Sequence, residues 1–195
     1  MLYKERRKGM IMAQPDRSSW QVKDTAILHE LIQLMGVTAE DSAILATLKP
    51  YAQANSAVMV KEFYDRLFSH EQTAEYFQGI SMERLHSMVA DWFQELFSGT
   101  YDTSYAQKRL NIGHIHVRIG LPVRYPLAML DVVATYGERV AMHSSNPTAA
   151  IAAFRKVIAL DVAIFNQAYE DNQLVHLAEL VGGERLARRL LTGSI

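Results

Sequence analysis

The sequence predicts an all-α protein, and three observations carry that prediction. Apolar residues recur at i, i+3, i+4 and i+7 along most of the 195 residues, the spacing of one face of an α-helix. Alternating β-branched runs closed by Asn-Gly or Asp-Gly turns do not occur. Gly36, Gly99 and Gly120 each follow a periodic segment, where glycine typically ends a helix. We therefore expect several helices packed around one core.

Composition limits the class of protein. A length of 195 residues fits one domain with a short appendage. Hydrophobic residues make up 49% and the net charge is −1, so a general nucleic-acid or membrane surface is not expected. The sequence has no cysteine, which excludes disulfides, thiolate zinc sites, iron–sulfur clusters and cysteine haem ligation, and is compatible with the cytoplasm. No apolar run reaches the roughly 18 residues of a membrane span.

The chain is expected to have three parts. Residues 1–20 carry a basic cluster, but the apolar run that follows it is too short for the hydrophobic region of a signal peptide, and these residues are interpreted as a flexible N-terminal arm. Residues 21–175 form the domain. Residues 176–195, interrupted by Gly182-Gly183, are either a C-terminal helix or the start of a linker to an output domain.

Helix-capping signals mark the first elements. A helix is expected over residues 24–35, with Asp24 as its N-cap. Thr38 and Asp41 resemble a capping box at the start of the next helix. Pro50 is expected to kink that helix, or to begin a separate one.

Two helices in the first half of the domain carry aromatic residues. Tyr64 shares a helix face with Val60 and Leu67 and so points inward, which is also where an ordinary packed aromatic would point. Ser81 caps a helix that runs to Gly99. Its apolar positions are Leu85, Met88, Val89, Trp92, Phe93 and Leu96. His86 lies beside this apolar stripe, so we expect it near the surface.

One histidine of the segment 103–119 is the strongest candidate for chemistry. Ile112, Ile115, His116 and Ile119 have the spacing of one helix face, so His116 is expected to point inward. His114 falls roughly 200° away around the helix and is expected to face out. A buried imidazole needs hydrogen-bond partners. His116 is therefore either a core histidine bonded to a carbonyl, or a metal ligand held by an acceptor at its other nitrogen.

The last helices are expected to form a dimer. Pro126 suits the first turn of a helix that buries Met129, Val133, Tyr136, Gly137 and Val140. Gly137 offers a spot where another helix could approach closely. The helix that follows, from Thr148, is apolar over much of its circumference, so it must be covered on more than one side. We expect a homodimer in which these two helices of each chain form an antiparallel four-helix bundle.

Several kinds of catalytic and metal-binding site can be excluded because their motifs are absent from the sequence. The sequence has no glycine-rich phosphate loop, no Gly-x-Ser-x-Gly and no His-Glu-x-x-His. His114 and His116 point apart on a helix and cannot chelate one ion. About seven or eight helices, one inward histidine late in the chain and many aromatic residues fit a haem protein.

Four segments then match one family. Residues 116–122, His-Val-Arg-Ile-Gly-Leu-Pro, resemble the proximal-histidine motif of the globin-coupled sensors, the haem sensor branch of the globins. The Phe63-Tyr64 pair is similar to that family's distal helix, and residues 83–99 resemble its E helix in spacing. Residues 48–50, Leu-Lys-Pro, match its first globin helix. The order and spacing agree over residues 24–175.

The resemblance implies a globin-like fold with an extra N-terminal helix, and haem b in a pocket between the helices. It implies that His116 is the proximal iron ligand and that Tyr64 donates a hydrogen bond to bound O2. Leu85 and Met88 would line the distal face, and Tyr125 would follow the proximal helix. Met88 replaces a second polar group of some relatives, so Tyr64 is expected to be the only distal donor. The remaining expected contacts with the cofactor are Phe63, Phe77, Trp92, Ile112 and Ile119.

The function implied is a non-enzymatic gas sensor that binds O2, and also CO and NO. An output domain such as a diguanylate cyclase or kinase could follow in a longer parent protein. Two alternatives come from other classes: a catalytic haem globin, such as a nitric-oxide dioxygenase or a peroxidase, and a purely structural helical adaptor. A further possibility is that His86 swings in as a sixth iron ligand.

Overall fold

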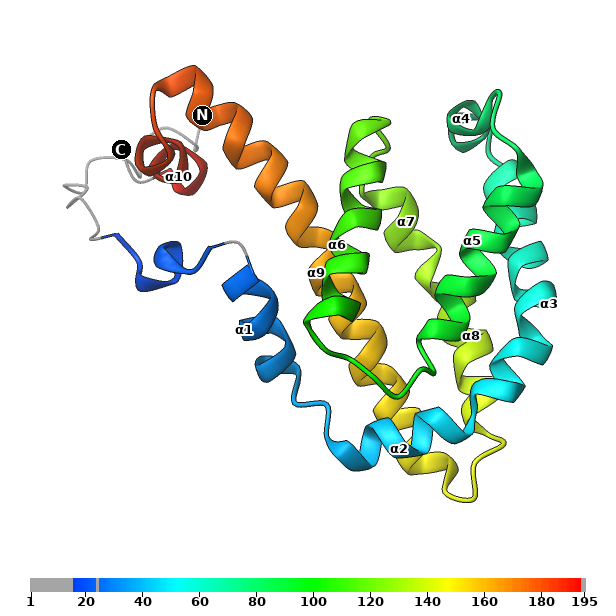
Figure 1. Cartoon of the computed structure of the whole chain (residues 1–195). Coiled ribbons are helices and arrows are strands. Elements are labelled where there is room, and N and C mark those ends of the chain that lie inside the picture. Colours follow the sequence, from blue (N-terminus) through cyan, green and yellow to red (C-terminus); the bar gives the residue numbers. More distant parts are fainter. Residues whose placement is uncertain (1–15, 24, 194–195) are drawn as a thin grey trace, which may run out of the picture. The chain divides into compact units, whose positions relative to one another are not determined.

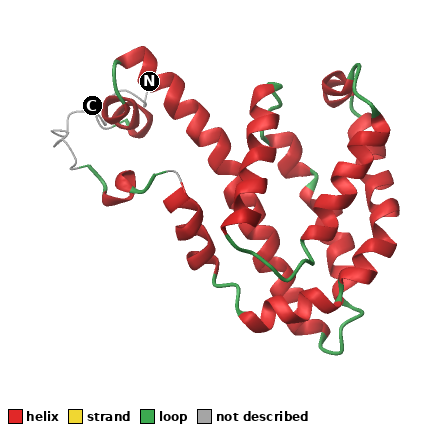
Figure 2. Ribbon diagram, in the orientation of Figure 1, coloured by secondary structure: helices red, strands yellow, loops and turns green. Residues whose placement is uncertain are grey.

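A computed structural model describes residues 16–23 and 25–193, and every regular element in these two ranges is a helix (Figure 2). The predicted all-α fold is confirmed. Most of the predicted N-terminal arm, and the predicted N-cap Asp24, lie outside the described residues.

The chain divides into two compact units (Figure 1). The larger unit is residues 25–169, and the smaller one combines the described residues before Asp24 with those from Glu170 onward. In chain order the helices are η1 (Ser18–Gln21), α1 (Thr25–Met35), α2 (Ala39–Thr47), α3 (Lys49–Phe68), α4 (Glu71–Ala74), η2 (Glu75–Phe77), α5 (Met82–Glu95), α6 (Thr103–Arg118), α7 (Arg124–Ala128), α8 (Leu130–Ala141), α9 (Pro147–Val181) and α10 (Glu184–Thr192).

Local signals set the starts of several helices as predicted. The Thr38–Asp41 capping box forms in both directions, with N–H to oxygen distances of 2.8 and 3.1 Å. Pro50 lies in the first turn of α3, so it begins a new helix rather than kinking an old one. Ser81 caps α5 by accepting from the Arg84 N–H.

The end of α5 differs from the prediction. The helix ends at Glu95, before Gly99, because the chain turns inward there and buries Leu96, Phe97 and Tyr101. Gly99 has a φ of +73° in this turn, and a Cβ built on it would lie 2.7 Å from the Cβ of Ala46. Close packing, together with backbone conformation, therefore requires glycine here.

The predicted helix from Pro126 is two helices, α7 and α8, separated at Met129. The Met129 nitrogen lies 3.2 Å from two carbonyl oxygens, those of Tyr125 and Pro126. The hydrogen bonding therefore changes locally from the four-residue spacing of an α-helix to the three-residue spacing of a 3-10 helix. The five residues predicted to be buried here are buried.

Gly137 does not provide the predicted site for another chain's helix. A Cβ at this position would lie 1.9 Å from Cζ of Phe154, so the Phe154 ring of α9 already fills the space above it. The glycine allows α8 and α9 of the same chain to pack closely. The phenylalanine that fills the gap is remote in sequence, which is why periodicity alone did not identify it.

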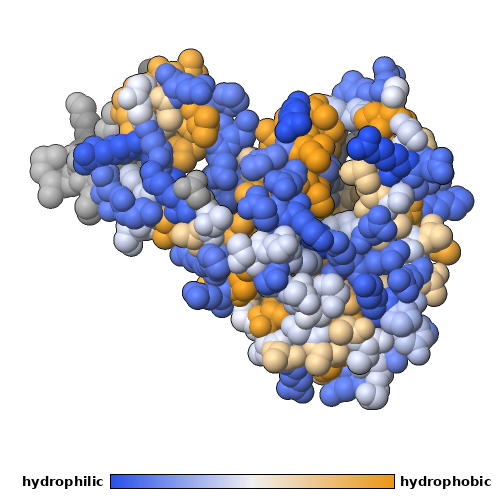
Figure 3. Space-filling model, in the orientation of Figure 1, coloured by the Kyte–Doolittle hydropathy of each residue, from blue (hydrophilic) through white to orange (hydrophobic). Residues whose placement is uncertain are grey.

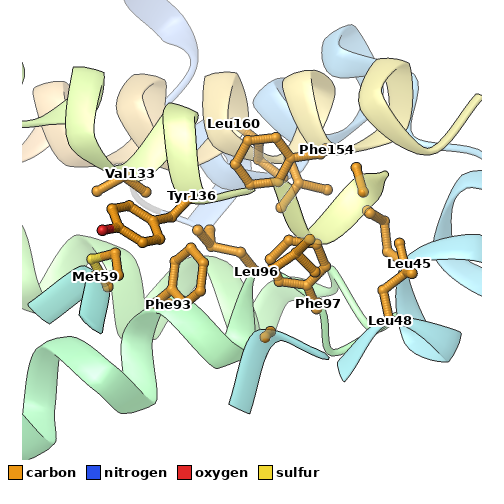
Figure 4. Packing of buried hydrophobic residues seen from close by; sticks show 14 of the residues in the cluster. Leu45, Leu48, Met59, Phe93, Leu96, Phe97, Val133, Tyr136, Phe154 and Leu160 are labelled. Atoms are coloured by element: carbon orange, nitrogen blue, oxygen red, sulfur yellow. The ribbon is translucent and has the colours of Figure 1, made fainter. Parts of the chain in front are cut away.

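The core of the larger unit forms where α2, α3, α5, α8 and α9 meet (Figure 4). Three fully buried phenylalanines lie at its centre: Phe93, Phe97 and Phe154. The rings of Phe97 and Phe154 stack with their centroids 5.4 Å apart. This core holds α5 against the helices that carry the candidate site.

The long helix α9 begins at Pro147, where Asn146 accepts from the Ala149 N–H as the predicted N-cap. It ends at Val181, and Gly182 follows with a φ of +82°, as expected for a break at Gly182-Gly183. None of the helices among the described residues is both long and apolar enough to cross a membrane.

Ion pairs connect the start of the smaller unit to α10. Asp16 pairs with Arg185 at 2.7 Å and with Arg189 at 3.3 Å, and Lys23 pairs with Glu184 at 2.7 Å. These pairs are partly exposed, so each contributes little stability by itself.

Candidate functional site

His116 lies on the border between two stripes of α6. One stripe, Ala106, Arg109 and Gly113, is buried. The other consists of the isoleucines at 112, 115 and 119, and the prediction that this face is buried is wrong for two of them. Ile115 is 44% and Ile119 45% exposed. The reason is that the buried stripe, here called the glycine stripe after Gly113, packs against α9, whereas the isoleucine stripe does not. A Cβ on Gly113 would lie 2.6 Å from the Cβ of Ala168 on α9.

The two ring nitrogens of His116 have different environments. Nδ1 lies 2.8 Å from the carbonyl oxygen of Ile112 one turn earlier. A carbonyl can only accept, so Nδ1 carries the proton and Nε2 presents a lone pair. Burial lowers the pKa of His116 below its ordinary value of 6.5, although the bond to Ile112 opposes this. The neutral imidazole required of a metal ligand is therefore favoured.

Phe165 of α9 supports the imidazole from the side. Its ring meets that of His116 edge-on, with the centroids 5.2 Å apart. Phe165 also packs near Tyr169, at 5.4 Å between centroids. The histidine is thus held by its own helix at Nδ1 and by α9 along its edge.

Apolar side chains gather beside His116. Figure 3 shows hydrophobic residues along the upper half of α6, next to a hollow that separates this helix from the α4–α5 side of the larger unit. The exposed fraction of Met88 on α5 is 45%, similar to the exposed fractions of Ile115 and Ile119 on α6. A single imidazole lone pair among large accessible apolar side chains fits a haem, which needs one strong axial ligand and apolar contact with its faces.

Tyr64 lies at the centre of an aromatic cluster from α3, η2 and α5. Its side chain is only 4% exposed. The centroid of its ring lies 5.4 Å from that of Phe63, 5.9 Å from Phe68 and 5.8 Å from Phe77. Burial raises the pKa of Tyr64 to about 12, so its hydroxyl keeps its proton and acts as a donor.

His86 reaches the same cluster. It is exposed, as predicted, yet its ring lies against Tyr64 with the centroids 4.7 Å apart. Leu85, the residue before it, packs against the core, whereas Met88 is largely accessible. Leu85, His86 and Met88 of α5 therefore differ in burial, and the only titratable one among them is His86.

The structure separates two other predicted cofactor contacts from this cluster. Trp92 donates from Nε1 to Asp161 of α9 at 2.8 Å, so its polar edge belongs to a buried ionic cluster. Tyr125 of α7 contacts Tyr76, with centroids 6.4 Å apart, and the Arg124 guanidinium lies over its ring at 4.6 Å. Ile112 contributes its carbonyl oxygen to His116.

Sequence reasoning missed three features of this region. Phe68 and Phe165 are ordinary apolar positions in the sequence, and nothing in the local pattern distinguishes them. Asp161 did carry a signal, because it is an acidic residue inside the apolar helix α9. Its partner Arg109 lies on the buried stripe of α6, which His116 borders.

Similarity to a known protein family covers most of this chain. The model of the Protoglobin family matches residues 24–174. The heme-based aerotactic transducer HemAT of Halobacterium salinarum is 30% identical over 164 residues, which cover 76% of this chain and 34% of that protein. This chain thus spans about a third of that relative's length.

A solved structure of a globin domain resembles this chain in fold. The globin domain of the Geobacter sulfurreducens globin-coupled sensor superposes with a TM-score of 0.67 at 28% identity, covering 72% of this chain and 96% of that one. The predicted globin-like fold is confirmed. The chain belongs to the Protoglobin family, and its resemblance to the globin-coupled sensors is borne out.

Proposed function

We propose that this chain is a haem-based gas-sensor globin domain that binds O2 reversibly and passes the binding signal to an output. The observation that carries the proposal is the state of His116: a neutral imidazole with Nδ1 fixed by the Ile112 carbonyl and Nε2 free to bind a metal. The similarity to a heme-based aerotactic transducer supports a signalling role rather than catalysis.

The proximal side is formed by this chain's α6 and α9. Haem b, when bound, would supply a ferrous iron able to bind O2, CO or NO. His116 would hold this iron through Nε2, and its hydrogen bond to the Ile112 carbonyl fixes the ring orientation and raises the basicity of Nε2. Phe165 restricts rotation of the ring from the side. The isoleucines at 112 and 119 offer apolar contact beside it.

The distal side is formed by α3 and α5. The Tyr64 hydroxyl is protonated and serves as the hydrogen-bond donor to bound gas, which favours O2 over the less polar CO. Phe63 and Phe77 fix the Tyr64 ring by edge contacts. Leu85 and Met88 exclude water, and neither can donate a hydrogen bond. Tyr64 is then the principal hydrogen-bond donor to the gas, and the His86 ring lies against it.

We further propose a cytoplasmic homodimer. A groove of about 520 Å³ runs between α7–α8 and α9, with only one polar residue in its lining. It is lined by Leu127, Leu130, Ala134, Ile158, Ala159, Val162, Ala163 and Asn166. The same face of a second copy is chemically matched to it, as a two-fold interface requires. Pairing the two faces would bury apolar surface that α9 exposes along its length.

The proposal is tested by the absorption spectrum of the haem-reconstituted chain in its oxidised, reduced and oxygenated states. We expect stoichiometric haem binding and a reversible oxygenated spectrum. His116→Ala should lose haem, or need added imidazole to retain it, because the axial nitrogen is gone. His114→Ala, on the same helix, is the matched control and should bind haem like the wild type.

Three outcomes would contradict the proposal. A His116→Ala spectrum equal to that of the wild type would remove the assignment of the ligand. Steady turnover of nitric oxide or peroxide by the purified chain would favour the catalytic alternative. A colourless protein after reconstitution would instead support a helical adaptor.

A further inference from the structure

A buried acidic residue joins three helices of the globin domain. Asp161 of α9 is 4% exposed and accepts hydrogen bonds from Trp92 Nε1 at 2.8 Å and from Arg109 Nε at 2.9 Å. The Tyr105 hydroxyl is a third donor to the same carboxylate. Trp92 belongs to α5, and Arg109 and Tyr105 belong to α6. One carboxylate therefore receives donors from the proposed distal helix and the proposed proximal helix.

Arg109 extends this cluster. Its side chain is 3% exposed, and its Nη1 pairs with Glu95 of α5 at 2.6 Å. The guanidinium also lies over the Tyr105 ring, 4.1 Å from the centroid. Within the described chain its Nη2 is buried without a hydrogen-bond partner. The guanidinium is thus bound on both sides, to α5 by Glu95 and to α9 by Asp161.

A buried ionic cluster of this kind contributes little net stability to the fold. Removing a carboxylate and a guanidinium from water costs much of what their attraction returns, and packed apolar side chains of similar size often stabilise a core equally well. Directional hydrogen bonds do what apolar contacts cannot: they fix the relative rotation and separation of the helices that carry them. The geometry of the cluster therefore points to a positioning role.

The cluster has residues on α5 and α6, the same helices that carry part of the candidate site. Arg109 and Gly113 belong to the buried stripe of α6 that His116 borders, and Arg109 lies two helical turns before His116. Trp92 lies one turn after Met88 on α5. In Figure 1, α5 descends to the loop that leads into α6, and α6 rises from it toward its His116 end. The cluster bonds the two helices to α9 near that loop, away from the His116 end.

We infer that Asp161 is a positioning residue that, through Arg109 and Trp92, sets the orientation of α6 and hence of His116 relative to α5. The inference rests on the proposed haem-sensor function. It also identifies α9 as the common support of both walls of the site, since Asp161 of α9 accepts hydrogen bonds from Trp92 of α5 and from Arg109 of α6.

The test is the double variant Arg109→Met, Asp161→Leu, studied as the haem-loaded full chain. Removing both charges together avoids leaving one of them buried and unpaired. We expect haem still to bind through His116. The ferrous iron–histidine stretching band in resonance Raman spectra should shift, and O2 dissociation should change roughly 2- to 30-fold, the range of couplings transmitted through packed helices.

A matched control removes an ion pair between helices that does not reach α6. Arg155 pairs with Glu138 of α8 at 2.7 Å on the surface, and Glu138→Gln, Arg155→Gln should leave the band and the dissociation rate unchanged. If the buried-pair double variant does not fold, Tyr105→Phe decides, because it deletes one donor to Asp161 and keeps both charges. The same spectral shift, in smaller measure, is then expected.

The outcomes separate the two proposals. If the wild type binds no haem, the proposed function fails. If the wild type binds haem, but a folded variant has the wild-type band and the wild-type O2 dissociation rate, the proposed function stands and the positioning role of Asp161 is wrong. Equal shifts in the surface control would also overturn it, because the effect would then not depend on the cluster.

Discussion

The hydroxyl of Tyr169 donates a hydrogen bond to the carbonyl oxygen of Leu121, 2.8 Å away. This bond fixes the turn that follows α6, the proposed proximal helix, to the long helix α9. Gly113 and His116 contact α9 as well, at Ala168 and Phe165 respectively. A displacement of α6 would therefore be transmitted to α9 at three successive points, through both packing and a polar contact.

Tyr169→Phe should weaken the attachment of this turn. The variant leaves the Leu121 carbonyl without its donor, and we expect a loss of about 1 kcal/mol in the free energy of unfolding. Denaturant unfolding of the chain measures this change. Tyr125→Phe is the control, because the Tyr125 hydroxyl only accepts from the exposed Arg124 at 3.2 Å, and it should change the free energy less. Equal losses would show that the bond to Leu121 contributes nothing specific.

Gly113→Ala should destabilise the contact between α6 and α9. The new methyl group would lie 2.6 Å from the Ala168 Cβ and 3.0 Å from the Phe165 carbonyl oxygen. Overpacking of this kind costs about 1–3 kcal/mol, measured by thermal or denaturant unfolding. Adding Ala168→Gly removes the nearer clash and should restore part of the loss. A double variant no more stable than the single one would locate the strain elsewhere.

Tyr64→Phe should speed the dissociation of O2 more than that of CO. A hydrogen bond of this kind is worth about 1–2 kcal/mol, so we expect a roughly ten-fold faster O2 off-rate by stopped-flow or flash photolysis. The ring contacts of Tyr64 remain, so haem content should not fall. Tyr76→Phe tests a tyrosine outside the cluster and should leave the rate unchanged. An unaltered off-rate in Tyr64→Phe would mean that the hydroxyl does not reach the gas.

Acid should destabilise the protein partly through Asp41. Burial opposes ionisation of this carboxyl, but hydrogen bonds from Lys156 and Thr38 outweigh it and lower the pKa below its ordinary value of 3.8. A group with a lowered folded-state pKa contributes stability that is present above the unfolded pKa and is lost as pH falls through the folded one.

This contribution is measured as the pH dependence of the free energy of unfolding. Between about pH 6 and about pH 3, Asp41→Asn should lose less stability than the wild type, because it lacks the group that titrates. Asp65→Asn removes an exposed ion pair with Lys61 and should follow the wild-type slope closely. Identical slopes for Asp41→Asn and the wild type would contradict the assignment.

Ala159→Arg should prevent the proposed dimer from forming. The residue lines the apolar groove of α8 and α9, and a charge there would have to be buried against the partner. Sedimentation velocity at micromolar concentration should show a dimer for the wild type and a monomer for the variant. Ala57→Arg, at an exposed position of α3 outside the proposed interface, should stay dimeric. A wild-type monomer would remove the dimer from the proposal.

The sequence by itself determined the helices and pointed to the two leading candidate site residues, His116 and Tyr64. Helix periodicity, the Thr38–Asp41 capping box and the glycine-proline signals are short-range features, governed by residues within one or two turns. For the same reason His116 and the Ile112 carbonyl that holds it could be expected together, since they are one turn apart on one helix. The proximal motif and the Phe63-Tyr64 pair then pointed to the family.

Only the tertiary structure decided which helices meet and what fills the space between them. Arg109 and Asp161 are separated by 52 positions in the chain, and periodicity within either helix cannot pair them. The Phe154 ring occupies the space at Gly137, and α9 covers the glycine stripe of α6 while Ile115 and Ile119 remain accessible. Helix faces are set by local spacing, but their partners depend on the packing of the whole chain, because burial and charge pairing act between residues far apart in sequence.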